Sequence, residues 1–167
     1  MPSLRRLART CVLVPKELCE RLALLRKESL PTETGGYLIG RRRGRHIEVT
    51  NATTQGTQDI ATRISFERVD NSHAVQAVDE WNKDRGFSGV VGDWHSHPIG
   101  TGVASAMDEQ AWRTLARAEH KAIAGLIFGE KTMSVYLAVP RWASFSISRC
   151  VLIEETDSDF AFGLAPR

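Results

Sequence analysis

The feature that most constrains this chain is a pair of histidines, one residue apart, at the end of a short apolar run. The run over residues 88–95 is bounded by turn-forming residues and predicts a buried strand that ends near His95. Because side chains alternate between the two faces of a strand, His95 and His97 are expected to point to the same side. Pro98 cannot donate to a strand ladder and therefore forces a loop at this point.

An aspartate follows the second histidine at a distance that a loop and one helical turn can span. Residues 99–104 are rich in glycine, Ser105 is a suitable helix N-cap, and Asp108 falls in the first helical turn. Imidazole and carboxylate groups are zinc ligands, and three of them leave the fourth tetrahedral position for water. His95, His97 and Asp108 are therefore predicted to bind one Zn²⁺ ion together with a catalytic water.

Each half of this pattern has a simpler interpretation on its own. A His-x-His pair is commonly polar filler, and Ser-x-x-Asp before an apolar helix is commonly a capping box. The two halves at this spacing, joined by proline and glycine, favour a metal site over both interpretations.

A hydrolytic zinc site also needs a proton acceptor for its water. Glu33 is the candidate, because it stands at the entrance to an apolar strand over residues 36–41. From the residues alone, a solvated loop position is the simpler interpretation of Glu33.

Composition and size place few limits on function. The 167 residues are 42% hydrophobic and 25% charged, which is ordinary for one globular domain, and the formal net charge of +2 points to no nucleic-acid or membrane partner. We expect a single catalytic domain over residues 1–153 and a disordered tail over 154–167. The three cysteines form no Cys-x-x-Cys pair, which favours a reducing compartment and the bacterial cytoplasm.

Hydrophobic periodicity predicts an α/β fold, a mixed β-sheet flanked by helices in two or three layers. Helices are expected over 15–28, 71–84 and 106–118, and strands over 10–14, 36–41, 46–51, 63–66, 88–95, 123–128, 134–139 and 142–153. In the second helix, the apolar residues Ala74, Val75, Val78 and Trp81 are expected to face inward. The basic run Arg41–Arg45 is interpreted as a hairpin turn rather than a phosphate-binding patch.

The polar positions together resemble the signature of a known family. Glu33 in Glu-Thr-Gly-Gly, His95 and His97 in His-Ser-His-Pro, and Ser105 and Asp108 in Ser-x-x-Asp are similar to the JAMM (MPN-plus) zinc metalloproteases, over about residues 12–140. The resemblance implies a cytidine-deaminase-like fold, zinc on the two histidines and the aspartate, Glu33 as general base and Ser105 as oxyanion donor. Non-catalytic scaffold members of the family lack one or more of these five positions, whereas this chain has them all.

The resemblance also implies a substrate class. In the family these residues hydrolyse amide or isopeptide bonds at the C-terminus of ubiquitin or a ubiquitin-like protein. The segments 36–40, 64–68 and 92–98 are similar to short bacterial members. One such type, in CBASS anti-phage operons, releases a cGAS-like nucleotidyltransferase from its conjugates, and another belongs to Bil ubiquitin-like operons. The implied partners are a ubiquitin-like or ubiquitin-like-conjugated protein and E1-like and E2-like enzymes.

Two other functions fit the same residues. Some bacterial members of the family trim the C-terminus of a small sulfur-carrier protein, and a non-catalytic MPN scaffold would hold zinc only structurally. A base deaminase with this fold would need cysteine ligands in a Pro-Cys-x-x-Cys run, which this sequence does not contain. The oligomeric state is left open by the sequence.

Overall fold

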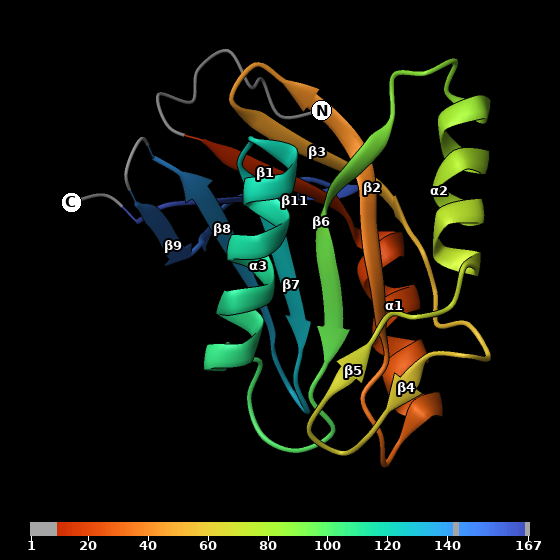
Figure 1. The fold of residues 1–167 in the computed structure, drawn as a ribbon. Helices are drawn as coiled ribbons and strands as arrows, with labels where there is room; N and C mark the ends of the chain where they lie inside the picture. Colours follow the sequence, from red (N-terminus) through yellow and green to blue (C-terminus); the bar gives the residue numbers. More distant parts are fainter. Residues whose placement is uncertain (1–9, 142–143, 166–167) are drawn as a thin grey trace.

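A mixed sheet of nine strands forms the centre of the computed structural model, which describes residues 10–141 and 144–165 (Figure 1). The strand order is β10-β11-β1-β3-β2-β6-β7-β8-β9, with parallel pairing between β1 and β3 and between β6 and β7. The helices are α1 Lys16–Ser29, α2 Ser72–Lys83 and α3 Ala106–Glu119. The strands of this sheet are β1 Cys11–Pro15, β2 Gly35–Arg43, β3 His46–Ala52, β6 Gly89–Ser96, β7 Ile123–Phe128, β8 Met133–Pro140, β9 Phe145–Arg149, β10 Val151–Glu155 and β11 Asp159–Gly163.

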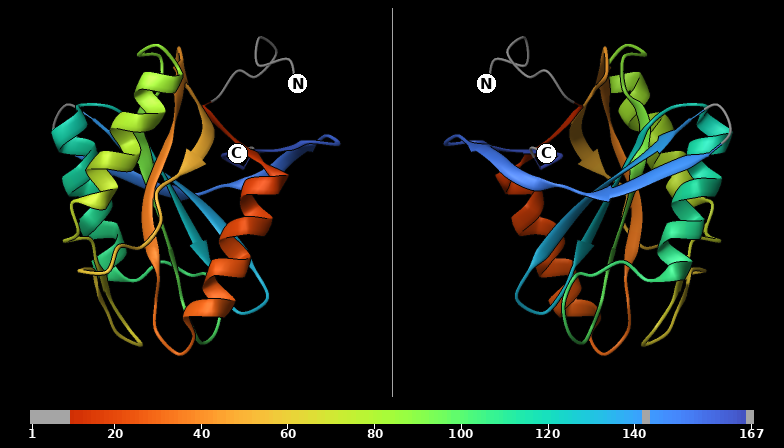
Figure 2. Two further views of the ribbon diagram at one scale, coloured as in Figure 1. Left: turned by 90° about the vertical axis from the view of Figure 1, so that its right-hand side faces the viewer. Right: turned by 90° about the vertical axis from the view of Figure 1, so that its left-hand side faces the viewer.

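The helices cover the two faces of the sheet separately. Helix α1 lies on one face, whereas α2 and α3 lie on the other (Figure 2). Leu18 and Leu22 of α1 belong to one buried apolar cluster, and Trp112 and Ala116 of α3 belong to a second. The predicted mixed sheet flanked by helices is therefore confirmed.

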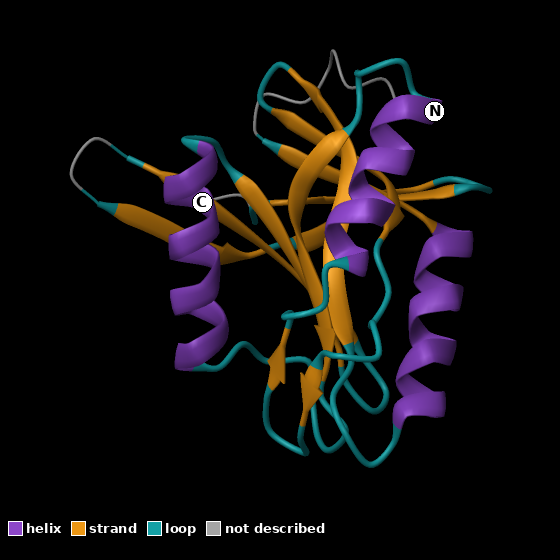
Figure 3. Ribbon diagram, turned by 45° about the vertical axis from the view of Figure 1, so that its right-hand side comes forward, coloured by secondary structure: helices purple, strands orange, loops and turns teal. Residues whose placement is uncertain are grey.

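The strand predicted over residues 63–66 is wrong. The structure instead has two short strands, β4 Ile60–Ala61 and β5 Phe66–Glu67, which pair antiparallel below the main sheet (Figure 3). Between them Thr62 N donates to Ser65 O at 2.9 Å, and the two hydroxyls lie 2.8 Å apart. Local hydroxyl bonding of this kind favours a turn over an extended strand.

The C-terminal part of the chain also differs from its prediction. The single strand expected over 142–153 is interrupted at Cys150, and its halves β9 and β10 lie at opposite ends of the sheet. Residues 142–143 lie outside the described residues. The disorder expected from residue 154 onward is also wrong for β11, which pairs with β1 along its whole length. Its short alternating segment, with Ala161 fully buried, lies between β10 and β1 in the sheet.

The inward apolar face expected for α2 is a further correction. Ala74, Val75, Val78 and Trp81 are exposed, while His73 is buried. The side turned toward the sheet is polar because His73 bonds Thr53 and Gln76 accepts from Thr54 N at 2.9 Å. Polar attachment of one side of the helix therefore turns its apolar stripe outward.

The basic run on the β2–β3 hairpin makes structural contacts. Arg41 pairs with Asp84, Arg42 donates to the carbonyl of Ala122, and Arg43 pairs with Glu48 at 2.6 Å. Gly44 adopts a positive φ of 62°, as a tight hairpin turn requires. The interpretation of this run as a hairpin turn is confirmed.

Candidate metal centre and active site

The two histidines are fixed by the end of β6 and its neighbours. His95 faces Gly35 of β2 in the strand register, and Ser96 N donates to Thr34 O at 2.8 Å. His97 follows the strand, and its N–H donates to Phe128 O at 2.9 Å. Strand alternation sends the side chain of Trp94 to the opposite face, where it is fully buried in the core.

Asp108 reaches the histidines from the first turn of α3. The capping box is complete, because Ser105 Oγ accepts from Asp108 N at 3.2 Å and Asp108 Oδ2 accepts from Ser105 N at 2.6 Å. The other carboxylate oxygen, Oδ1, lies 3.0 Å from His95 Nε2. The cap and the metal-site interpretations of this motif are thus compatible, since the cap is what orients the carboxylate. Ser105 itself is exposed at the helix start.

The three predicted ligands converge on one point. His95 Nε2 lies 3.2 Å from His97 Nε2, and Asp108 Oδ2 lies 3.6 Å from His97 Nε2. One ligand atom from each of the three residues lies within 4.8 Å of the other two. Zinc–ligand bonds of about 2.0–2.1 Å place tetrahedral ligand atoms about 3.3–3.4 Å apart. The donor set and its spacing therefore fit a zinc ion.

The charges of the site favour an ionised aspartate beside the histidines. Burial raises the pKa of Asp108, but hydrogen bonds from His95 and His97 outweigh burial and hold this pKa well below its usual range. The hydrogen bond to Asp108 in turn raises the pKa of His97. A carboxylate that stays charged is the form that binds a metal.

Glu33 lies in the same pocket, in the connection between α1 and β2. Its N–H donates to Thr62 O at 2.7 Å, and only 7% of the residue is exposed. The solvated position suggested by the residues alone is therefore wrong. The carboxylate lines one pocket with His95 and Asp108. Burial raises the pKa of Glu33, an effect partly offset by the nearby histidines.

Two residues of this pocket were missed by sequence reasoning. Asp93 is buried on β6, where Oδ1 accepts from Trp112 Nε1 at 2.5 Å and Oδ2 accepts from Arg68 Nη2 at 3.1 Å. The guanidinium of Arg68 also lies 4.8 Å from the ring centre of Tyr37. Strand alternation could have found Asp93, which stands two positions before His95 and so shares its face.

The remaining walls of the pocket are largely apolar. Ile64 and Phe66 approach from the β4–β5 hairpin, and Met107 and Ala111 from α3. Ile64 and Met107 are exposed at its rim.

In the described part of the chain, none of the helices has the length and apolar character needed to cross a membrane.

Three bacterial proteins that are similar in sequence to this chain share one name. A protein of Escherichia coli strain TW11681 named CD-NTase/cGAS isopeptidase is 33% identical over 102 residues, which cover 60% of this chain and 65% of that protein. Proteins of the same name from Vibrio cholerae serotype O1 and Pseudomonas aeruginosa strain BWHPSA011 are 33% and 29% identical. They match 50% and 63% of this chain and 54% and 68% of their own lengths. Two of the three relatives are thus covered over less than two thirds of their length.

The fold has a counterpart among solved structures. The solution structure of protein DSY2949 from Desulfitobacterium hafniense has a TM-score of 0.58 and 22% identity, over 89% of this chain and 94% of that structure. This likeness supports the fold alone. The sequence profile described as prokaryotic homologs of the JAB domain matches residues 15–157, which is most of the chain. The chain therefore belongs to the family of prokaryotic JAB-domain proteins.

Proposed function

We propose that this chain is a zinc-dependent isopeptidase that releases a CD-NTase, a cGAS-like nucleotidyltransferase, from proteins to which it is conjugated in a ubiquitin-like manner. The observation that carries the proposal is the convergence of His95, His97 and Asp108 at one point, together with the buried Glu33, which lines one pocket with His95 and Asp108. The described residues would act as one catalytic domain, in the cytoplasm of a bacterium.

The metal ligands and the base have separate roles. His95, His97 and Asp108 would hold the ion, and bound zinc lowers the pKa of a coordinated water to about 7. Glu33 would accept the proton of that water and then deliver it to the leaving lysine amine. A carboxyl group whose pKa is raised by burial is suited to hold this proton between the two steps.

Ser105 would stabilise the oxyanion that forms on the scissile carbonyl. Its Oγ accepts from Asp108 N, so the hydroxyl proton remains available to the substrate. A hydroxyl that is already oriented by the helix cap needs little reorganisation when charge develops. The same side chain would then serve both the cap and the reaction.

The names of the relatives favour a CD-NTase as the released protein. E1-like and E2-like enzymes would form the conjugate that this protein cleaves. Deconjugation of a Bil-type ubiquitin-like protein and trimming of a sulfur-carrier protein would use the same residues, so the substrate must be separated by experiment. A non-catalytic scaffold is disfavoured because all five polar positions are present.

The test is cleavage of three defined substrates by the zinc-loaded protein, followed by mass spectrometry. They are a CD-NTase C-terminal peptide joined to a lysine side chain, the same linkage to a ubiquitin-like protein, and a sulfur-carrier protein with a C-terminal extension. Cleavage of the first at the isopeptide bond, lost in Glu33→Ala, is expected. Preference for another substrate would replace the proposed target, and cleavage of none would contradict the proposed activity.

A further inference from the structure

A buried arginine reaches the metal-ligand segment from the opposite face of the sheet. Arg26 lies in the last part of α1, on the face away from α3 (Figure 2). Its Nε donates to the carbonyl of His97 at 3.0 Å, and its Nη2 donates to the carbonyl of Pro98 at 2.8 Å. The guanidinium therefore holds two successive carbonyls, one of which belongs to a predicted metal ligand.

The carbonyls of His97 and Pro98 lie just beyond the end of β6, outside the regular strand pairing. β6 ends at Ser96, and the glycine-rich segment 99–104 follows Pro98. The N–H of His97 is bonded to β7, but its carbonyl points to α1. Because a planar guanidinium offers parallel donors in a fixed fork, it can fix the peptide plane between His97 and Pro98.

Helix packing alone does not explain an arginine at this position. Among the described residues, the polar partners of the Arg26 side chain are main-chain carbonyls, and no carboxylate lies within ion-pair distance. Burying a guanidinium without a counter-ion costs more than burying an apolar side chain of similar volume, such as methionine. What the arginine adds is the pair of hydrogen bonds to the ligand segment.

We propose that Arg26 is a positioning residue that keeps the imidazole of His97 in the geometry required for metal binding. The inference rests on the proposed function, since it assumes that His97 is a ligand. His95 is held inside the sheet, whereas His97 lies just beyond it and depends on contacts from outside the strand. Loss of a hydrogen-bond partner in the outer shell of a metal site typically weakens metal binding by about 10–100-fold.

The experiment measures zinc affinity by competition with a chelator, together with the absorption spectrum of the Co²⁺-substituted protein. Arg26→Met is expected to weaken zinc binding by about 10–100-fold and to alter the Co²⁺ spectrum. Arg26→Lys, which keeps the charge but loses the fork, is also expected to weaken zinc binding, by less than Arg26→Met. Lys27→Ala, at the exposed neighbouring position, should match the unmodified protein. Circular dichroism and thermal melting of the metal-free proteins report a purely structural effect separately.

The outcomes separate this inference from the proposed function. If the unmodified protein binds no stoichiometric zinc, the proposed function fails and the inference with it. If it binds zinc and folded Arg26→Met binds equally well, only the inference is overturned, even if the melting temperature falls. If Arg26→Met does not fold, Arg26→Lys decides, and unchanged affinity in that variant overturns the inference.

Discussion

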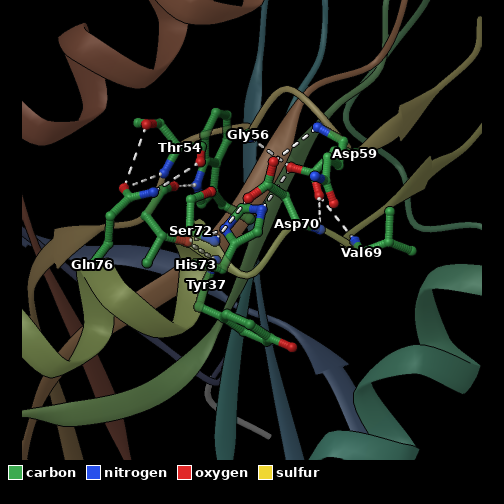
Figure 4. A network of polar contacts seen from close by, with 12 residues as sticks. Tyr37, Thr54, Gly56, Asp59, Val69, Asp70, Ser72, His73 and Gln76 are labelled. Carbon is green, nitrogen blue, oxygen red and sulfur yellow. Dashed lines mark hydrogen bonds and ion pairs between the residues drawn. The ribbon is translucent and has the colours of Figure 1, made fainter.

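Two groups in the described part of the molecule bring a histidine against a carboxylate, and they differ in what surrounds them. In the predicted metal centre, His95 Nε2 lies 3.0 Å from Asp108, and in the network of Figure 4, His73 Nε2 lies 2.7 Å from Asp59. The side chain of Asp108 is 15% exposed and faces a pocket, whereas that of Asp59 is 0% exposed. Similar pair distances therefore occur in an accessible and in an enclosed setting.

The enclosed carboxylate has its hydrogen-bonding capacity filled. Asp59 Oδ2 accepts from Gly56 N at 2.7 Å in addition to His73, and Oδ1 accepts from Val69 N and Asp70 N, both at 2.9 Å (Figure 4). Four donors on two oxygens leave little capacity for a metal or a substrate. Through these hydrogen bonds, Asp59 stabilises the connection between β3 and α2.

The enclosed group even has the order of a hydroxyl–imidazole–carboxylate relay. Thr53 Oγ1 lies 2.7 Å from His73 Nδ1, on the side opposite Asp59, so the three groups follow one another as in a hydrolytic triad. Thr53 is buried, however, and its hydroxyl oxygen already accepts from Tyr37 N at 2.8 Å. Access and unfilled acceptor positions, rather than pair geometry, therefore distinguish a reactive group from a structural one.

Alanine substitution of His95 and of His73 should have opposite effects on zinc content. His95→Ala removes a predicted metal ligand, so stoichiometric zinc and all hydrolysis should be lost. His73→Ala should keep one zinc per chain. Metal content by atomic emission and peptide cleavage measure both effects. Zinc retained in His95→Ala, or lost in folded His73→Ala, would reverse the roles of the two histidines.

Removal of the proposed base should separate metal binding from chemistry. Glu33→Ala is expected to lower the rate of hydrolysis by about 10²–10⁴-fold, the usual contribution of a general acid–base group. Zinc content should stay at one per chain, because Glu33 is not among the predicted ligands. Full activity in this variant would remove Glu33 from the mechanism. Glu67→Ala, at an exposed residue of β5, is the matched control.

Substitution of the enclosed carboxylate of Asp59 should lower the free energy of unfolding and leave the metal content unchanged. Asp59→Ala leaves three N–H groups and His73 without their acceptor, and losing one member of a buried pair costs about 3–5 kcal/mol. Urea denaturation of the zinc-free protein measures the loss, with exposed Asp79→Ala as control. A normal unfolding free energy in Asp59→Ala would show that the network does not hold this connection.

Ser105 contacts Asp108 directly, so its substitution can affect both the reaction and the helix cap. Ser105→Ala should raise the activation free energy by about 3 kcal/mol if the hydroxyl stabilises the oxyanion. Loss of the cap alone would instead lower the unfolding free energy by about 1 kcal/mol. Ser105→Thr keeps a hydroxyl and should restore most of the activity. Equal kcat for Ser105→Ala and the unmodified protein would exclude the oxyanion role.

The local parts of the site could be predicted from the sequence. Three local signals each determine a single element: the apolar run before His95, the loop-forming residues after Pro98 and the capping motif at Ser105. The structure has β6 and α3 where these signals predict them. Strand alternation then brings both histidines to one side. Short-range rules suffice for these predicted ligands because they lie close together in the chain.

The supporting contacts could not be predicted in the same way. Arg26 meets His97 across 71 residues, and no local pattern links the two positions. The outward apolar face of α2 depends on the polar side of the helix finding Thr53, which a hydrophobic period cannot reveal. The pairing of β11 with β1 likewise joins the two ends of the described chain. Such long-range contacts decide which of several locally acceptable arrangements forms.

The smallest expected effect is a pH dependence at the rim of the enclosed network. Backbone hydrogen bonds from Ser72 and Gln58 lower the pKa of Asp70 to about 2, below the usual value near 3.9. Since the pKa of Asp70 is lower in the folded state than in the unfolded state, these hydrogen bonds contribute their full stabilisation above about pH 4. This contribution to the unfolding free energy is lost as the pH falls through about 2.

The variant Asp70→Asn isolates this contribution. The difference in unfolding free energy between the zinc-free unmodified protein and Asp70→Asn should be constant from about pH 7 to 5, shrink below about pH 4 and be small near pH 2. Urea titrations at several pH values measure it, and the many other carboxylates cancel in the difference. A difference that stays constant down to pH 2 would mean that the N–H groups of Ser72 and Gln58 do not favour the ionised form of Asp70. This part of the network would then be held only by the hydrogen bonds that Asp59 Oδ1 accepts from Val69 N and Asp70 N.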